Sequence, residues 1–418
     1  MAEIERKLLP RPTYDGLLDS YLDTDPIKVL SGVRRCGKSS LLRMLAERLL
    51  AKGIPEENVL YKKLDSFDTP LEPTNAWLDD LLRRALAERR QSSPFYVFLD
   101  EVQEVPGWER VIRRLHTEQV ADIYLTGSNA FLLSSDLATY LSGRYIEVSV
   151  WPLSFSEYVD FSHAADLCTS ELSQEDLFSR YVRYGGMPGL FDRPGFEEEF
   201  VMKELTAIHD TVILNDVAKR FDLRDIDLLE KLVRYVYSTS GSLFSSRKIA
   251  DTLTSMGRKT NPATVDSYLG ALRRAFLVSR CKQEGIAGKT VLQPMQKLFV
   301  PDTGLRNREI GFRPQDIGYQ LENVVFCELR RRGYEVHVGA GSSGEVDFVA
   351  DRQNERLYIQ VSSNIVEEKT FERELKSLEA IHDSFPKIVL TRDSLYWGMT
   401  KSGIAILSLI GWLLDDTR

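Results

Sequence analysis

The sequence predicts an α/β protein with a parallel sheet at its N-terminal end, helices in the middle and a second α/β region at its C-terminal end. Three observations support this. A short apolar strand pattern near residue 30 is followed at once by a glycine-rich loop and a helical pattern. Helical periodicity dominates from about residue 151 to residue 275, and strand and helix patterns alternate after residue 320. At 418 residues, two to four domains are expected.

The glycine-rich loop has the pattern of a phosphate-binding loop, GxxxxGK[ST]. It follows an apolar strand pattern at Pro26–Ser31 and precedes a helical pattern at Ser40–Ala51. Glycines allow backbone N–H groups to face a phosphate, the helix N-terminus adds its positive end, Lys38 reaches the β- and γ-phosphates, and the Ser39 hydroxyl ligates magnesium. We therefore expect ATP and Mg²⁺ at a continuous stretch: Gly32, Val33, Arg34, Arg35, Cys36, Gly37, Lys38, Ser39 and Ser40.

A second apolar strand pattern, Pro94–Val102 (PFYVFLDEV), carries two adjacent carboxylates where the apolar run ends. The carboxyl end of a strand beside the phosphate-binding loop is where an acid holds magnesium, and this role is predicted for Asp100. Glu101, next to it, is predicted to polarise the attacking water. Together with the loop, these acids predict ATP hydrolysis.

A third strand pattern, Asp122–Thr126, is expected to lie between the other two strands and ends before Ser128 and Asn129. We predict that these two polar residues sense the γ-phosphate or the attacking water, although a plain polar turn is an alternative. Arg144 follows a loop that is expected near the nucleotide. It is predicted to neutralise transition-state charge, within its own subunit or in a neighbouring one of a homo-oligomer, and a plain surface arginine is the alternative.

Composition limits the classes of protein and partner. The formal net charge is −8, which argues against a chain that is basic throughout. The four cysteines, Cys36, Cys168, Cys281 and Cys327, are far apart, so neither a disulfide framework nor a zinc site is expected. The N-terminus has no apolar signal segment, and the apolar run Gly403–Leu414 is too short to span a bilayer. A cytoplasmic protein without a membrane partner is expected.

Several motifs together resemble a family of prokaryotic AAA+ ATPases, in which a P-loop module precedes a C-terminal domain of unknown function. These motifs are GVRRCGKSS, FLDEVQ, LTGSN, SGR followed by EVSVWPLSFSEY, YGGMPGL, LFVPDTGLRN, and GEVDFVAD followed by YIQVS. The resemblance covers essentially the whole chain. It implies an AAA+ or RecA-like nucleotide-binding domain over residues 1–150 and a helical lid or linker over residues 151–224, with a hinge or turn at Gly185–Gly189.

Residues 225–300 have the pattern of a winged helix. Helical patterns at Ile226–Tyr237, Ser246–Met256 and Ala263–Ala275 are followed by a strand pattern that begins at Phe276. Between residues 241 and 300 there are 10 Lys and Arg against 3 Asp and Glu, although the chain as a whole is acidic. Such a surplus suits phosphate contacts, so DNA is the expected partner. A winged helix that serves only packing or protein contacts is the alternative.

The order of elements in residues 301–418 resembles the restriction-endonuclease-like fold. In that fold a helix carries one acid, a strand carries an Asp, and the next strand carries E-x-K. Glu322 and Asp347 match the first two acids, whereas Gln360 and Ser362 stand at the third acid and the lysine. Glu345 is expected on the same strand face as Asp347, as an incomplete substitute. Because metal-assisted hydrolysis needs anionic ligands and a cation or base, we expect a scaffold without nuclease activity.

Three functions follow from these patterns. The first is a Mg²⁺-dependent ATPase that acts as a DNA-associated switch or motor. The second is a nucleotide-dependent switch whose C-terminal parts bind a protein partner. The third, an ATP-coupled nuclease, is disfavoured by Gln360 and Ser362.

Overall fold

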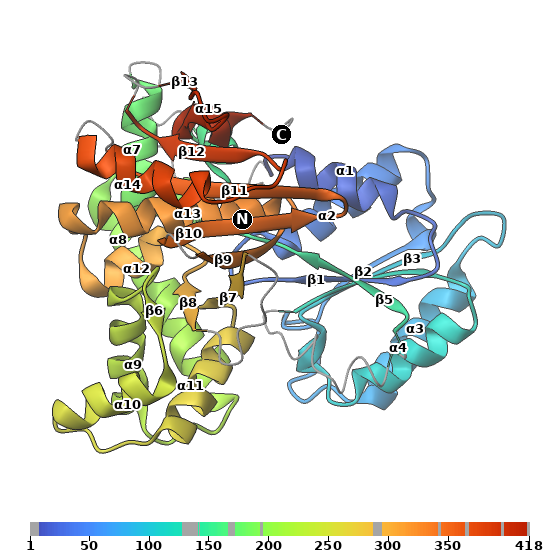
Figure 1. Cartoon of the computed structure of the whole chain (residues 1–418). Coiled ribbons are helices and arrows are strands. Elements are labelled where there is room, and N and C mark those ends of the chain that lie inside the picture. Colours follow the sequence, from blue (N-terminus) through green and yellow to red (C-terminus); the bar gives the residue numbers. More distant parts are fainter. Residues whose placement is uncertain are drawn as a thin grey trace. The chain divides into compact units, whose positions relative to one another are not determined.

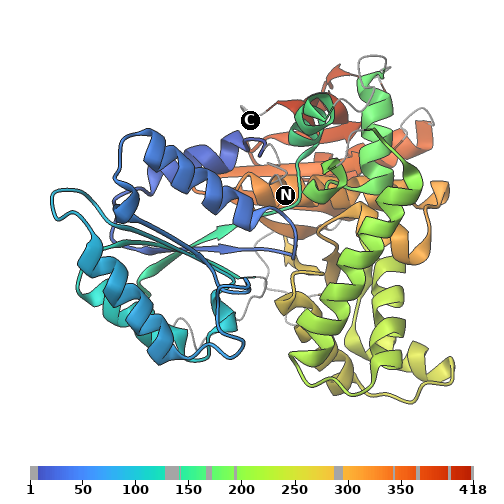
Figure 2. The same cartoon turned by 180° about the vertical axis from the view of Figure 1, so that it is seen from behind.

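The chain folds into two compact units, Met1–Val150 and Trp151–Arg418 (Figure 1; Figure 2). The computed structural model describes residues 8–127, 141, 143–165, 172–192, 195–286, 295–341, 344–363, 368–393 and 397–415, with the side chains of 368–371 and 373–374 outside that description. The domains expected over residues 151–224, 225–300 and 301–418 all fall within the second unit and stay predictions.

The first unit is a five-stranded parallel sheet between helices, in the strand order β2-β3-β4-β1-β5. The strands are β1 (Ile27–Ser31), β2 (Val59–Lys63), β3 (Tyr96–Asp100), β4 (Asp122–Thr126) and β5 (Tyr145–Ser149). The helices are α1 (Pro12–Ser20), α2 (Lys38–Ala51), α3 (Asn75–Glu88) and α4 (Trp108–Thr117). Helices α1 and α2 cover one face and α3 and α4 the other (Figure 1). Covered on both faces, β1, β3 and β4 are buried along their whole length, and the buried Lys28 of β1 is paired with Asp122 of β4 at 2.6 Å.

The second unit combines helices with a nine-stranded mixed sheet in the order β13-β14-β12-β11-β10-β9-β7-β8-β6. Its helices are α6 (Phe155–Ala164), α7 (Gln174–Tyr184), α8 (Glu198–Thr211), the π-helix η6 (Val212–Lys219), α9 (Ile226–Ser238), α10 (Ser246–Ser255), α11 (Pro262–Arg274), α12 (Thr303–Ile310), α13 (Ile317–Arg331), α14 (Glu368–Glu379) and α15 (Leu409–Leu414). Its strands are β6 (Leu243–Phe244), β7 (Ser279–Gly285), β8 (Gln296–Phe299), β9 (Glu335–Gly341), β10 (Gly344–Arg352), β11 (Glu355–Ser362), β12 (Lys387–Thr391), β13 (Gly398–Met399) and β14 (Ala405–Ser408).

The elements of residues 226–299 continue the C-terminal sheet. In chain order they are α9, β6, α10, α11, β7 and β8, and the three helices lie within one or two residues of the predicted bounds. Strand β7 pairs antiparallel with β8 and parallel with β9, so the expected winged helix and the C-terminal domain share one sheet. Figure 1 shows α9, α10 and α11 at the β6 end of that sheet.

One hydrophobic core joins the helices after residue 151 to the C-terminal sheet. Phe155 of α6 and Phe178 of α7 belong to the same buried cluster as residues of α13, β10 and α15. The opposite face of the sheet packs a second cluster that includes Leu378 of α14. The segment expected as a lid is therefore helical, as predicted, and its first two helices pack into the core of the second unit. Its role as a lid stays a prediction.

Two glycine motifs of the second unit interlock. Asp302 Oδ1 accepts from the N–H of Leu305 at 3.0 Å and caps α12, while Oδ2 accepts from the N–H of Gly186 at 2.7 Å. A Cβ on Gly185, whose φ is +77°, would lie 2.1 Å from Asp302 Oδ1, and one on Gly304 would lie 2.0 Å from the Tyr184 carbonyl oxygen. Glycine is therefore required at both positions. The expected break at Gly185–Gly189 is a turn bonded to α12.

The apolar C-terminal run forms strand β14 and helix α15, and most of its apolar side chains are buried. Across the described residues, no helix combines the length and the apolar character that crossing a bilayer would require.

Candidate functional site

The phosphate-binding loop leaves the central strand β1 and enters α2. Gly32 has φ +150°, and a Cβ there would lie 2.1 Å from the carbonyl oxygen of Val150, so only glycine fits. Gly37, with φ +104°, is the N-cap of α2 and provides no side chain to bond the first N–H groups of the helix. This end of α2 therefore presents backbone donors and the positive end of the helix dipole, the arrangement that binds phosphate.

Lys38 lies folded against the loop that it follows. Its side chain is almost fully buried, and Nζ donates to the carbonyl oxygens of Gly32 at 2.9 Å and Val33 at 3.1 Å. Both acceptors are neutral, so the loop positions the ammonium group without neutralising its charge. The ammonium is thus available to an anion that enters the loop.

The remaining loop residues differ in exposure. Val33 and Cys36 are buried, and the Cys36 thiol donates to the Val150 carbonyl oxygen at 3.2 Å. Arg34 and Ser40 are half-buried, and Arg35 is exposed with φ +64°. The described cysteines Cys36, Cys281 and Cys327 are free thiols.

The carboxylate of Asp100 faces the first turn of α2. Ser39 Oγ donates to Asp100 Oδ1 at 2.9 Å, and the Thr126 hydroxyl donates to the same oxygen. Asp100 Oδ2 is buried and has no hydrogen-bond partner in the described part of the chain. Burial raises the pKa of Asp100, whereas the bonds from Thr126 and Ser39 act in the opposite direction. A serine hydroxyl beside a carboxylate with one oxygen unused is a set of hard oxygen ligands that fits Mg²⁺.

Glu101 follows β3 in the left-handed region, with φ +56°. Its backbone N–H donates to Thr126 Oγ1 at 2.9 Å, and its carboxylate accepts a hydrogen bond from the Gln103 side chain. The carboxylate is only partly exposed. The turn therefore fixes the second acid at the same edge of the sheet as Asp100 and the loop.

Two residues of this site escaped the sequence analysis. Thr126 ends β4, next to the end of β3, and its hydroxyl joins Asp100 to the backbone of Glu101. Arg11, before α1, is buried, donates to the Cys36 carbonyl oxygen at 3.0 Å and stacks on Tyr14 at 4.5 Å. A hydroxyl in the last position of a strand was the available signal for Thr126. The sequence offers no comparable signal for Arg11.

Of the remaining predicted residues, the structure describes only Arg144, which does not lie at the loop. Ser128 and Asn129 lie outside the described residues, although β4 does lie between β1 and β3 as expected. Arg144 is exposed and precedes β5, where its carbonyl oxygen accepts from the N–H of Ile27 at 3.0 Å. This is the start of β1, at the edge of the sheet opposite the loop, about 13 Å of strand away. The position does not fit the predicted role within the same subunit.

The second unit contains the other predicted acids, with a cation that the sequence analysis did not expect there. Lys297 Nζ of β8 lies 3.1 Å from Glu322 Oε2, 2.8 Å from Glu345 Oε1 and 3.7 Å from Asp347 Oδ1. We call these four residues the lysine cluster. The two acids that match the resemblance, Glu322 and Asp347, thus meet Glu345 at one ammonium group, and Glu345 shares a face with Asp347 as expected. Burial, followed by the nearby Asp347 carboxylate, raises the pKa of Glu322.

Hydrogen bonds of Gln360 and Asp347 join strands β10 and β11. The side-chain oxygen of Gln360 accepts from the Asp347 N–H at 3.0 Å, and Asp347 Oδ2 accepts from the Val361 N–H at 2.9 Å. Strand β10 shifts register between Val346 and Val349, so a β-bulge surrounds Asp347. Ser362 carries no charge at the position on β11 where the resemblance has a lysine. Lys297 supplies a cation from β8 instead.

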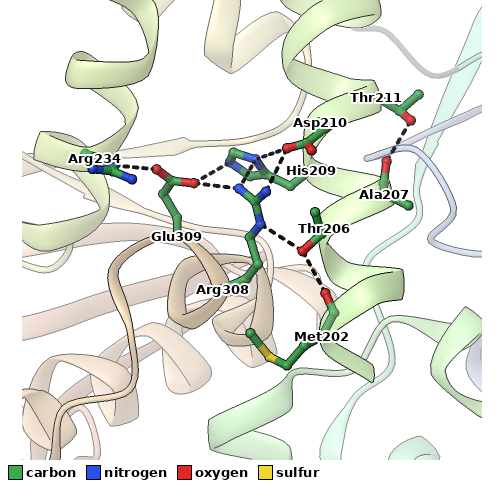
Figure 3. A network of polar contacts seen from close by, with 9 residues as sticks. All are labelled: Met202, Thr206, Ala207, His209, Asp210, Thr211, Arg234, Arg308 and Glu309. Atoms are coloured by element: carbon green, nitrogen blue, oxygen red, sulfur yellow. Dashed lines mark hydrogen bonds and ion pairs between the residues drawn. The ribbon is translucent and has the colours of Figure 1, made fainter. Parts of the chain in front are cut away.

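The buried His209 belongs to a network of hydrogen bonds and ion pairs between helices. In Figure 3, Arg308 of α12 bonds His209 Nδ1 and Asp210 of α8, at 3.1 and 2.9 Å, while Glu309 accepts from Arg234 of α9 at 2.7 Å. Burial, followed by the charge of Arg308, lowers the pKa of His209. This network fastens α8 and α9 to α12.

Three potential metal ligands also approach one another on β7, β9 and β10. Ligand atoms of Glu284, His337 and Asp351 lie within 4.8 Å of one another. Arg356 donates to both Asp351 oxygens, at 2.6 and 2.8 Å. Because this bidentate pair already satisfies the carboxylate, we assign no metal to the group.

Comparisons with known proteins agree with the geometry. A family model described as an AAA domain matches residues 24–159, and one described as a domain of unknown function matches residues 175–316. An uncharacterized protein of Haemophilus influenzae is 38% identical over 421 residues, which cover 99% of this chain and 100% of that protein. An uncharacterized protein of Methanocaldococcus jannaschii is 29% identical over 397 residues, covering 91% of this chain and 81% of the relative.

A solved structure shares the fold. The Walker-type ATPase of Pyrococcus abyssi superposes with a TM-score of 0.51 at 17% identity, covering 72% of this chain and 95% of that one. At this identity the likeness concerns the fold alone. The strand order, the phosphate-binding loop, the family match and the full-length relative agree, and the chain belongs to the family of AAA+ P-loop ATPases in which the AAA domain precedes a domain of unknown function.

Proposed function

We propose that this protein hydrolyses ATP with Mg²⁺ and couples hydrolysis to DNA bound by residues 226–299. The observation that carries the first part is the junction of α2 and β3. There Ser39 Oγ lies 2.9 Å from Asp100 Oδ1, and Asp100 Oδ2 has no partner among the described residues. A buried carboxylate oxygen without a donor has a large desolvation cost, which a bound cation offsets.

Each residue at this edge has a distinct task. The loop N–H groups and Lys38 bind the phosphates, and Ser39 and Asp100 hold the metal, directly or through water. Bound magnesium supplies positive charge that offsets the charge of the phosphate oxygens. Glu101 accepts a hydrogen bond from the attacking water and polarises it. Thr126 keeps both acids in place through its single hydroxyl.

Arg144 is proposed to act on the nucleotide of a neighbouring subunit. It is exposed and lies at the edge opposite its own loop, so only the loop of another copy is within its reach. An arginine supplied in this way neutralises transition-state charge. This part of the proposal requires that the active form is a homo-oligomer.

The DNA part rests on basic side chains without acidic partners. Several basic side chains between residues 241 and 286 are exposed or half-buried and make no ion pair within the described structure. They are Arg247, Lys248, Lys259, Arg273, Arg274, Arg280 and Lys282. Burial, then Arg280 and Arg274, lower the pKa of Arg273, so like charges repel one another at the end of α11. A phosphate backbone relieves that repulsion, whereas acidic neighbours would have relieved it already.

ATP turnover with duplex, single-stranded and branched DNA tests the proposal. We expect one form of DNA to stimulate turnover, and binding to weaken steeply as salt rises. Arg273→Ala with Arg280→Ala is expected to lower DNA affinity and to reduce the salt slope by about one for each phosphate that is no longer neutralised. Lys231→Ala is the matched control, because Lys231 is exposed but already paired with Asp227 at 3.0 Å.

Two results would change the proposal. No turnover by the wild-type protein, with or without DNA, would overturn the ATPase part. Turnover that no DNA alters, together with no salt-dependent DNA binding, would overturn the DNA part and favour a nucleotide-dependent switch that binds a protein.

A further inference from the structure

The lysine cluster contains a buried ammonium group surrounded by carboxylates. The Lys297 side chain is 4% exposed, and those of Glu322 and Asp347 are 13% and 11% exposed. Its ammonium faces oxygens from two elements, Glu322 on α13 and Glu345 and Asp347 on β10. Lysine is rarely buried unless its charge is paired, so these acids are what hold it inside.

Strand pairing fixes the direction from which the ammonium enters. Lys297 pairs with Cys281 of β7 on one side and with Leu243 of β6 on the other, so β8 is held within the sheet. The lysine thus comes from the strands that follow α9 and α11, whereas the acids come from the C-terminal part of the unit. The same contact that neutralises the acids also ties these two parts together.

The oxygen atoms around Lys297 are of the kind that binds a divalent cation. Carboxylates of Glu322, Glu345 and Asp347 are hard ligands suited to Mg²⁺ or Mn²⁺. Their nearest oxygens stand 2.8, 3.1 and 3.7 Å from the Lys297 nitrogen, wider than the roughly 2.0–2.1 Å that Mg²⁺ requires. A dication at the same place would meet the ammonium as a like charge, in a buried setting where repulsion is strong. The two cations therefore exclude each other.

We propose that the Lys297 ammonium is a built-in substitute for a divalent metal, which keeps the lysine cluster free of metal and unable to hydrolyse phosphodiesters. Metal-assisted cleavage needs a bound cation with an open position for water and substrate. An ammonium group offers only N–H donors and activates no water as a Lewis acid. The cluster then serves as an internal joint of the second unit. This inference is independent of the ATPase and DNA proposals.

Removal of the ammonium should open a metal site. In Lys297→Met, a similar volume remains and the charge is lost, leaving three acids close together. We expect Mn²⁺ titration of the full-length, nucleotide-free chain to show one more bound ion than the wild type, with a melting temperature that rises as Mn²⁺ is added. Adding Asp347→Asn to this variant should remove the extra ion. Lys376→Met, which changes an exposed lysine on α14, should gain no ion and should melt as the wild type does.

Lys297→Gln and the wild-type protein keep the proposal testable if Lys297→Met does not fold. Lys297→Gln should also gain an ion. Wild type and Asp347→Asn should bind equal numbers of Mn²⁺ ions, and neither should cleave DNA in Mn²⁺. Failure of a folded Lys297 variant to gain an ion would overturn the inference. So would Mn²⁺-dependent DNA cleavage by the wild type that both Lys297→Met and Asp347→Asn abolish, since Lys297 would then act beside a metal.

Discussion

The nucleotide site and the lysine cluster use the same residue types in opposite ways. In the first unit, Lys38 bonds two carbonyl oxygens of its own loop, and Asp100 keeps one buried oxygen without a partner among the described residues. In the second unit, Lys297 lies among three carboxylates. The first arrangement leaves both charges available to a ligand, whereas the second satisfies them internally.

This difference teaches that residue identity does not decide whether an acid can take a metal. What decides it is where the nearest ammonium is anchored. Lys38, at the start of α2, is held by the carbonyl oxygens of its own loop. A lysine on a paired strand, such as Lys297 on β8, is carried into the acids by the sheet itself.

The largest effect is expected at the nucleotide site, when Glu101 is changed. In Glu101→Gln, the group placed to accept a proton from water is lost while its size is kept. We expect ATP turnover to fall by about two to four orders of magnitude with ATP still bound, as general-base loss typically produces. Single-turnover hydrolysis and equilibrium nucleotide binding measure the two parts. Unchanged turnover would show that Glu101 is not the base; Glu104→Gln, three residues away, is the control.

Asp302 extends the comparison to a carboxylate that backbone N–H groups bond and that no cation pairs with among the described residues. Burial raises the pKa of Asp302 to about 6. The folded protein therefore binds this proton more tightly than the unfolded chain. The stabilising contribution is present below about pH 4 and is lost as the pH rises through 6. Two pKa units correspond to about 3 kcal/mol at most.

The difference between wild type and Asp302→Asn isolates that contribution. We expect the unfolding free energy of the wild type to fall by up to about 3 kcal/mol relative to Asp302→Asn between pH 4 and pH 7.5, measured by urea denaturation. Asp227→Asn, on an exposed residue, should show no such difference. Parallel pH profiles for wild type and Asp302→Asn would contradict the prediction.

The sequence was sufficient wherever the chemistry is contiguous. Strand, glycine loop, Lys38 and Ser39 form one stretch, and Asp100 and Glu101 end one apolar strand, so their positions follow from chain order. Arg144 shows where that reasoning stopped short. Because it precedes a parallel strand while Asp100 ends one, the two lie at opposite edges of the sheet. Strand direction alone could have placed Arg144 at the edge opposite its own loop.

Contacts between strands that are far apart in the chain could not be predicted from the sequence. Lys297 counted as one basic residue in a basic segment, and only the pairing of β8 with β7 and β6 turns it toward Glu345. Thr126 was passed over for a different reason. A hydroxyl at the end of a strand is common, and its value depends on the neighbouring strand that ends in Asp100.

A smaller effect on ATP affinity is expected when the Lys38 ammonium group of the nucleotide site is removed. Lys38→Ala deletes a charged donor to the phosphates but leaves the loop N–H groups in place. Charge-assisted bonds of this kind contribute roughly 1.5–3 kcal/mol, so ATP affinity should fall about 10- to 100-fold, measured by titration calorimetry. Lys52→Ala, at the exposed end of α2, should bind ATP as the wild type does. Equal affinity for both variants would mean that Lys38 stays on its carbonyls when ATP binds.

The smallest effect concerns Thr126, which acts through the two acids that its hydroxyl joins. Thr126→Val keeps the shape of the side chain but removes the hydroxyl that donates to Asp100 and accepts from the Glu101 N–H at 2.9 Å. The loss of such bonds costs roughly 1–2 kcal/mol, so turnover should fall about 10-fold.

If Thr126 positions Asp100 for the metal, the Mg²⁺ concentration needed for half-maximal turnover should rise as well, which a general loss of stability would not produce. Thr117→Val, where an exposed hydroxyl donates to the Arg113 carbonyl oxygen at 2.8 Å, should leave both quantities unchanged. A rise in the Mg²⁺ requirement for Thr126→Val alone would place the coupling between β4 and β3 inside the catalytic cycle, whereas equal values for both variants would limit Thr126 to packing.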